Sequence, residues 1–172
     1  KNGTDSMIKK IISGGQTGVD QAALRAAQAA GLKTGGWAPK GCRTEAGCEP
    51  WLADFGLSEC DQPGYPARTL ANVRDSHGTL LVGNPFTPGS KVAISAAETI
   101  RRPLLITSRQ HRGRTVNEHT VQDADPELVV IWLITNQIAV LNVAGNRESS
   151  SPGISAAAER FLARVFADYQ RA

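Results

Sequence analysis

The chain has 172 residues, of which 41% are hydrophobic and 20% charged, so it can bury a sizeable core and is most simply one domain. Its formal net charge of +3 is too small to indicate a nucleic-acid-binding protein by itself. No apolar run is long enough to span a bilayer, and the first residues, KNGTDS, are polar and unlike a signal peptide. We therefore expect a cytoplasmic protein that binds neither nucleic acid nor membrane.

The sequence before the first predicted strand carries little fold information. Met7 is the only methionine and stands directly before that strand, so we expect residues 1–6 to be a remnant of expression cloning and residues 7–172 to form one ligand-binding domain. Three cysteines, Cys42, Cys48 and Cys60, fit no common zinc spacing, and their odd number argues against a disulfide framework. Free thiols are expected.

The stretch IKKIISGGQTGVDQAALRAAQAAG, residues 8–31, predicts a strand, a tight turn and a helix. The apolar run ends at Gly14 and Gly15, and alanines at helical spacing follow. The free N–H groups of a helix N-terminus favour an anion, commonly a phosphate. The alternative is a capping box of Thr17 and Asp20, which would satisfy the helix end without a ligand. The turn matches neither the dinucleotide fingerprint nor a Walker A loop.

Four more strands are predicted, at residues 32–38, 78–83, 102–107 and 138–145. A glycine- and proline-rich segment, residues 39–66, follows the second strand and is expected to be functional or partly structured. Helices are predicted over residues 67–76, over 87–102 with Thr87 as N-cap and Pro88 at the first helical position, and within 116–137. The last helix has one apolar stripe that should cover the sheet, formed by Ile154, Ala158, Phe161, Leu162, Val165, Phe166 and Tyr169.

Strands that alternate with helices predict an α/β fold with a parallel sheet. We expect a single Rossmann-like three-layer domain with a mainly parallel five-stranded sheet in the order 2-1-3-4-5. Ligands bind such sheets at the carboxyl ends of the strands where the order reverses. The loops after the first and third strands are therefore predicted to flank one crevice.

Four segments, SGGQTGVDQAAL, GGWAPKG, NVRDSHGTLLV and LNVAGNRESSSPGI, resemble the molybdenum carrier proteins, also described as molybdenum cofactor carriers. The resemblance runs from Ile8 through Ile154. This Rossmann-like family is similar in fold to the LONELY GUY type phosphoribohydrolases, formerly called lysine decarboxylase-like. The resemblance implies a non-catalytic carrier that binds molybdenum cofactor (molybdopterin) by its phosphate, with no catalytic metal. It also implies a homo-oligomer and, as partners, molybdoenzymes or cofactor-synthesis proteins.

The resemblance also implies positions for the ligand. The phosphate would lie on the first loop, opposite the loop that precedes the helix at residue 87, and these two loops supply Gly14, Gly15, Gln16, Thr17, Gly18, Thr87, Gly89 and Ser90. Lys40 would line the mouth of the crevice, and Arg43 and Glu45 match the charged positions that follow it in the family. Trp37 would stack on a flat heterocycle or else pack at the rim. Arg147 would contact an anion or else be a surface charge.

An enzyme of the same fold is the alternative function. The hydrolase relatives carry the signature P-G-G-x-G-T-x-x-E, and the segment PGSKVA places Ala93 where the catalytic glutamate would stand. Alanine cannot transfer a proton, so a nucleotide-phosphate hydrolase would need another carboxylate, Asp75 or Glu45. His77, His111 and His119 are scattered and predict no metal site. A nucleotide-sensing module is the third hypothesis.

Overall fold

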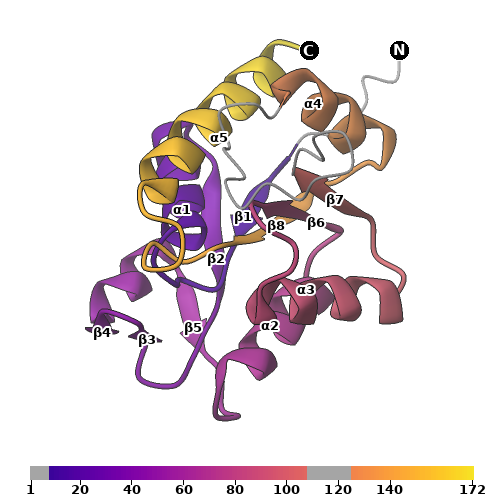
Figure 1. Cartoon of the computed structure of the whole chain (residues 1–172). Helices are drawn as coiled ribbons and strands as arrows, with labels where there is room; N and C mark the ends of the chain where they lie inside the picture. The colour runs from indigo at the N-terminus through magenta and orange to yellow at the C-terminus, as the bar shows by residue number, and fades with distance from the viewer. Residues whose placement is uncertain (1–7, 108–124) are drawn as a thin grey trace.

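The computed structural model describes residues 8–107 and 125–172, and Met7, His111 and His119 lie outside these ranges. A six-stranded sheet in the order β5-β2-β1-β8-β6-β7 forms its centre, and the strands in it pair in parallel (Figure 1). The strands are β1 (Lys10–Ile12), β2 (Lys33–Ala38), β5 (Leu57–Glu59), β6 (Gly78–Val82), β7 (Leu104–Thr107) and β8 (Val140–Gly145). The predicted Rossmann-like α/β fold is confirmed.

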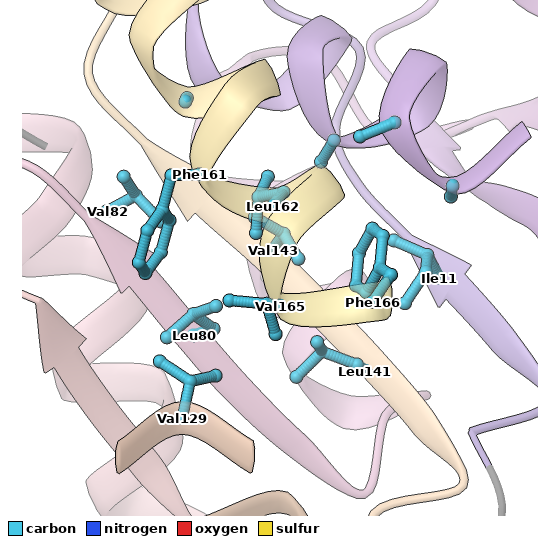
Figure 2. Close-up of a cluster of buried hydrophobic side chains, with 14 of the residues drawn as sticks. Ile11, Leu80, Val82, Val129, Leu141, Val143, Phe161, Leu162, Val165 and Phe166 are labelled. Carbon is cyan, nitrogen blue, oxygen red and sulfur yellow. The ribbon is translucent and has the colours of Figure 1, made fainter. Parts of the chain in front are cut away.

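Helices cover both faces of the sheet. One layer holds α1 (Val19–Ala29), α4 (Pro126–Thr135) and α5 (Ile154–Arg171), and the other holds α2 (Tyr65–Arg74) and α3 (Pro88–Thr99) (Figure 1). Every residue of the apolar stripe predicted for the last helix is buried. Figure 2 shows Phe161, Leu162 and Val165 of α5 packed over Leu80 of β6 and Val143 of β8. Each such buried side chain stabilises the fold by about 1.5–3 kcal/mol.

The predicted strand order, 2-1-3-4-5, was wrong. The last predicted strand, β8, lies between β1 and β6, with Ile12 opposite Asn142 and Val82 opposite Gly145. The physical reason is burial, because a central parallel strand is covered by helices on both faces. Residues 141–143 of β8 are buried, whereas every residue of β7 is only half-buried, as suits an edge strand.

The expected number of five strands was also too small. The sixth strand, β5, lies in the glycine- and proline-rich segment at residues 39–66 and has only three residues, too few for a period to appear. The same segment holds a short hairpin of β3 (Arg43–Thr44) and β4 (Gly47–Cys48), and the 3-10 helix η1 (Pro50–Phe55). This segment is therefore partly structured, as expected.

The strand order places the carboxyl ends of β1, β8 and β6 side by side. If the strands are renumbered so that β8 is strand 1 and β1, β2, β5, β6 and β7 follow it, the order across the sheet is 4-3-2-1-5-6. This is the order of a doubly wound sheet, in which the strand sequence runs one way from β8 to β5 and the other way from β6 to β7, so the reversal lies between β8 and β6. A ligand site is expected at this reversal. Within the described ranges, none of the helices has the length and apolar character needed to cross a membrane.

Candidate functional site

A cavity of about 370 Å³ lies at this reversal. Its walls come from the start of α1, the first half of α2, the N-terminus of α3 and the end of β8. It is lined by Gln16, Asp20, Tyr65, Arg68, Thr69, Leu81, Thr87, Pro88, Gly89, Ser90, Ala93, Ala144, Gly145, Asn146, Arg147, Ser149 and Ser150. The loops after the first and third predicted strands therefore flank one cavity, with the end of β8 between them.

The glycines of the first loop make room for other parts of the protein. A Cβ on Gly14 would lie 1.6 Å from Nη1 of Arg68, so the missing side chain admits the guanidinium. Gly18, with φ of 80°, lets the β8–α5 loop approach, because its Cβ would lie 2.3 Å from the carbonyl oxygen of Asn146. Both glycines are required by this packing whether or not a ligand is bound.

The start of α1 is held by backbone contacts. Its N-cap is Gly18, without a side-chain cap, so the alternative capping box of Thr17 and Asp20 does not form. The N–H of Val19 donates to the carbonyl of Asn146 at 3.1 Å. The carboxylate of Asp20 turns back and accepts from the N–H of Gln16 at 3.2 Å. Several donors that could face an anion here are thus used within the protein.

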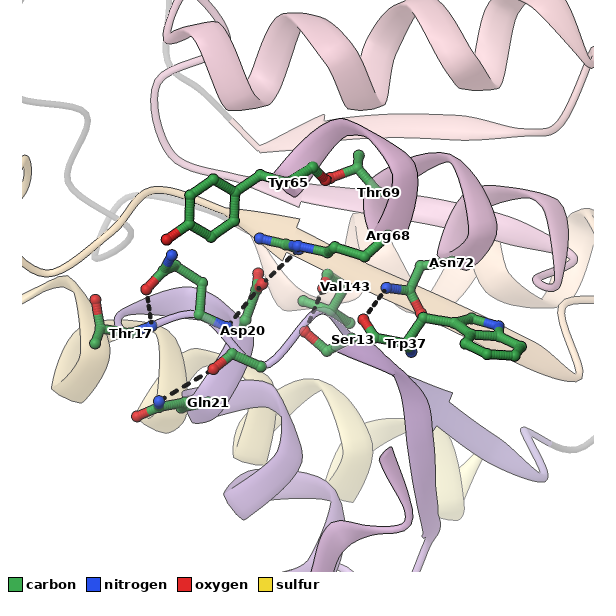
Figure 3. Close-up of polar contacts among 12 residues, drawn as sticks. Ser13, Thr17, Asp20, Gln21, Trp37, Tyr65, Arg68, Thr69, Asn72 and Val143 are labelled. Carbon is green, nitrogen blue, oxygen red and sulfur yellow. Dashed lines mark hydrogen bonds and ion pairs between the residues drawn. The ribbon is translucent and has the colours of Figure 1, made fainter. Parts of the chain in front are cut away.

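A buried ion pair joins α1 and α2 beneath the cavity. Arg68 Nη1 donates to Asp20 Oδ2 at 3.0 Å, and their side chains are only 10% and 4% exposed (Figure 3). Burial raises the pKa of the Asp20 carboxyl, although Arg68, the N–H of Gln16 and the charge of Arg147 act in the opposite direction. A cation and an acid that lie out of water thus border the same cavity.

Two buried side-chain nitrogens in the described part of the chain have no hydrogen-bond partner, Gln16 Nε2 and Arg68 Nε. The Gln16 amide is oriented by its oxygen, which accepts from the N–H groups of Thr17 at 3.0 Å and Glu45 at 2.9 Å. Its nitrogen is therefore left as a donor. Burying an unpaired donor destabilises a fold by about 1–3 kcal/mol, so a ligand acceptor at this point would be favourable.

The N-terminus of α3 forms the opposite wall. Its N-cap is Thr87, as predicted, which accepts from the N–H of Ser90 at 3.2 Å, and Pro88 occupies the first helical position. Gly89 faces open space, since a Cβ there would meet no atom within 4 Å. A helix N-terminus favours negative charge, so this wall adds to the attraction for an anion.

Asn146 fixes the two sides of the cavity relative to each other. Its side-chain oxygen accepts from the N–H of Asn84 at 2.6 Å, and its nitrogen donates to the Asn84 carbonyl at 3.1 Å. Its backbone carbonyl meets the N–H of Val19. One buried residue thus ties the β6–α3 loop to the start of α1.

Two guanidinium groups lie near the ring of Tyr65. The Arg147 carbon Cζ lies 4.6 Å from the centre of the Tyr65 ring, and that of Arg68 lies 5.9 Å from it. The ring and both cations line the cavity. Aromatic and cationic recognition are therefore combined at one point.

Five of the predicted site residues line this cavity, namely Gln16, Thr87, Gly89, Ser90 and Arg147. Four others, Gly14, Gly15, Thr17 and Gly18, shape the first loop without lining it. Lys40 and Arg43 are exposed and do not line the cavity. Trp37 lines a separate hollow with Lys10 and Asp75, and its Nε1 donates to Asp75 at 2.7 Å.

The alternative catalytic carboxylates lie outside the cavity. Asp75 is the C-cap of α2 and is bound to Trp37 and Arg74. Glu45 is exposed at the β3–β4 turn and accepts from Thr17 and Ser149. Ala93 is buried and lines the wall where the hydrolase glutamate would stand.

Sequence reasoning missed Asp20, Tyr65, Arg68 and Asn146 as cavity residues. The sequence indicated Asp20 only as a possible capping residue. Arg68 could not be assigned, because a helical sequence pattern does not show which residue of another helix an arginine side chain contacts. The Cys42, Cys48 and Cys60 thiols are free, as expected.

Over residues 11–166 the sequence matches the family described as "Circularly permutated YpsA SLOG family". A crystal structure at 1.45 Å resolution of the "Putative molybdenum carrier protein" from Syntrophus aciditrophicus SB is similar to this chain, with a TM-score of 0.78 and 37% sequence identity. The similarity covers 92% of this chain and 94% of that one. No curated protein matches.

Proposed function

Because this chain belongs to the circularly permutated YpsA SLOG family, and because a similar protein bears the name of a molybdenum carrier, we propose that it is a carrier for molybdenum cofactor. The phosphate-bearing pterin binds in the cavity between β8 and β6. The protein holds and protects this ligand and does not transform it. Molybdoenzymes or cofactor-synthesis proteins would then receive or supply it.

One observation carries the proposal, the pair of buried donors without partners. These donors, Nε2 of Gln16 and Nε of Arg68, belong to two residues that line the cavity, and the N-terminus of α3 lines it too. A phosphate has enough acceptor oxygens to satisfy both, and a guanidinium binds phosphate more strongly than a neutral donor does. The first loop contributes through Gln16, while Gly14 makes room for Arg68.

The chemistry of the cavity fits a cofactor better than a bare metal cation. Its volume of about 370 Å³ lies within the range of small-molecule sites, about 300–1,000 Å³. In the described ranges, no group of three or more His, Cys, Asp or Glu side chains is arranged to hold a metal ion. The protein would therefore hold the molybdenum through the organic part of the cofactor.

Titration with molybdenum cofactor and with metal-free molybdopterin, under anaerobic conditions, tests this proposal. We expect saturable binding of both, at least tenfold weaker in Arg68→Lys and Gln16→Leu, which remove the two donors. Arg43→Ala removes an exposed charge outside the cavity and serves as the control. Undetectable binding at high protein concentration would overturn the molybdenum assignment.

Two other outcomes would select the alternative functions. Binding of a purine monophosphate, but not of the pterin, at a site that needs Arg68 would indicate a nucleotide-sensing module. Release of free base from nucleoside monophosphates at an enzymatic rate would indicate a hydrolase. We expect no such turnover, because Ala93 supplies no proton-transferring group.

We also propose that the protein is a cytoplasmic homo-oligomer in which two copies pair through the outer face of α4. Three large apolar side chains of this helix, Leu128, Ile131 and Ile134, are exposed. Free thiols at all three cysteines support a reducing compartment.

A further inference from the structure

The aromatic residue placed to recognise the ligand is Tyr65 at the N-terminus of α2. Its ring lines the cavity together with Gln16 and Arg68. Trp37, in contrast, lines a different hollow, and its indole nitrogen is bound to Asp75. Figure 3 shows the two rings on opposite sides of Arg68 and Asn72. A ring in this cavity would therefore meet Tyr65 and not Trp37.

The guanidinium of Arg147 lies over the ring of Tyr65. Its Cζ lies 4.6 Å from the ring centre, and no hydrogen bond or ion pair of the guanidinium is found within residues 8–107 and 125–172. It lies close enough to Asp20 and Glu45 to lower the pKa of each, without bonding to either. A cation that lines a cavity without a direct bond to an acid is available to an anion.

The contact with a ring is weak compared with a phosphate contact. A cation–π contact at a partly exposed site is worth about 0.5–1 kcal/mol, whereas charge-assisted hydrogen bonds to phosphate are stronger and frequently bidentate. An incoming anion thus attracts Arg147 away from the ring. The exposed aromatic face can then take a flat ring from the same ligand.

We propose that Tyr65 is the stacking platform for the flat ring of the ligand and that Arg147 moves from this ring to the anionic group when the ligand binds. The inference rests on the proposed function and deepens it. It requires one molecule that carries both a planar heterocycle and a phosphate. A simple sugar phosphate would satisfy only half of the site.

Two probes with the same phosphate separate these contributions, guanosine 5′-monophosphate and ribose 5-phosphate. By calorimetric titration of the full chain we expect the nucleotide to bind about tenfold more tightly, because stacking on an aromatic side chain adds to the phosphate contacts. Tyr65→Leu, which keeps an apolar side chain but removes the ring, should abolish this ratio, and Tyr65→Phe should retain it. Arg147→Ala should weaken both probes, and Trp37→Phe should change neither.

The outcomes distinguish this inference from the proposed function. If ribose 5-phosphate binds through Arg68 but the tenfold ratio is absent, or persists in Tyr65→Leu, the stacking assignment is overturned and the anion site stands. If neither probe nor molybdopterin binds to the folded wild-type protein, both are overturned. Thermal unfolding of each variant shows whether it is folded. If Tyr65→Leu is not folded, Tyr65→Met takes its place, since it also removes the ring and should abolish the ratio.

Discussion

At the scale of single residues, Gly14 makes room for an arginine side chain. Gly14 has no side chain where Nη1 of Arg68 lies, and that guanidinium in turn pairs with Asp20. Three residues from the first loop, α1 and α2 are thus mutually dependent. The alternatives of a phosphate loop or a simple turn, both reasonable from the sequence, left out this third role, because it depends on a residue in a different helix.

Gly14→Ala should therefore destabilise the fold through Arg68. A methyl group at this position would displace the guanidinium and leave the buried carboxylate of Asp20 without its partner, which lowers the free energy of unfolding by about 3 kcal/mol. Denaturant unfolding measures the change. Gly89→Ala is the matched control, since its methyl group would meet no atom within 4 Å, and it should stay within about 1 kcal/mol of wild type. Equal stability of the two variants would contradict this account of Gly14.

The raised pKa of Asp20 predicts a pH dependence of stability. Burial raises the pKa of this carboxyl above 3.8, so the folded state binds the proton more tightly than the unfolded state does. Its stabilising contribution is then fully present below about pH 3.8 and is lost as the pH rises through the folded-state pKa. The free energy of unfolding of wild type, minus that of Asp20→Asn, should fall over this interval in urea titrations at successive pH values. A difference that rises with pH would show that the pairing with Arg68 outweighs burial.

At the scale of elements, the cavity is held together by contacts between loops and not by the sheet alone. The β3–β4 hairpin reaches the start of α1 and the β8–α5 loop through Glu45, which accepts from the hydroxyl of Thr17 and from the N–H and hydroxyl of Ser149. Burial acts to raise the pKa of Glu45, but these hydrogen bonds and the charge of Arg147 outweigh it and lower the pKa. The carboxylate therefore stays ionised near neutral pH.

Removing this carboxylate should loosen the rim of the cavity while leaving the core intact. In Glu45→Ala we expect faster amide hydrogen exchange at Ser149, whose N–H loses its acceptor, and in the hairpin, which loses its side-chain contacts with Thr17 and Ser149. Exchange in β8 and α5 should be unchanged. Asp54→Ala, on η1, removes an exposed carboxylate that makes no such contact and should leave the rim protected. Unchanged exchange in Glu45→Ala would show that the hairpin is held by other contacts.

At the scale of the whole molecule, the sequence was sufficient for the fold class but not for the strand order. The amphipathic stripe of α5 and the capping residues of α3 are local signals, and both were read correctly. The position of β8 depends on which apolar strands pair with it. Two apolar strands of similar composition could exchange places in the sheet without any change in the local sequence pattern. Asn142, a polar residue inside β8, finds a partner in Thr79 of β6, a match that only the folded arrangement reveals.

The same limit applies to the candidate site. Gln16, Thr87, Gly89 and Ser90 follow predicted strands directly, so topology alone brings them to the carboxyl edge. Tyr65 and Arg68 enter the cavity from α2, which follows the short strand β5 that the sequence did not predict. Because β5 was not predicted, the sequence did not show that the start of α2 lies at the carboxyl edge of the sheet, and Tyr65 and Arg68 could not be assigned to the site.

Among the described residues, the outer face of α4 exposes three of the large apolar side chains. Leu128, Ile131 and Ile134 are 61%, 52% and 45% exposed, and a helix that is apolar on all sides is normally buried. The one charged residue of α4 is Glu127, in its first turn. A twofold antiparallel pairing of two copies buries the apolar face and leaves the two Glu127 side chains at opposite ends of helices about 15 Å long. A second copy therefore fits this face without a clash of like charges.

Ile131 lies near the middle of this face, where a twofold axis brings it close to its counterpart. Wild type should sediment as a dimer at micromolar concentration and Ile131→Glu as a monomer, because two carboxylates would then be buried against each other. Ile131→Lys should also be monomeric, and an equimolar mixture of the two variants should recover the dimer, since opposite charges then meet. Leu70→Glu is the matched control, because Leu70 is 49% exposed but lies on α2, on the opposite face of the sheet, and this variant should remain dimeric. A monomeric wild type, or an Ile131→Glu variant that still sediments as a dimer, would exclude α4 as the interface between copies.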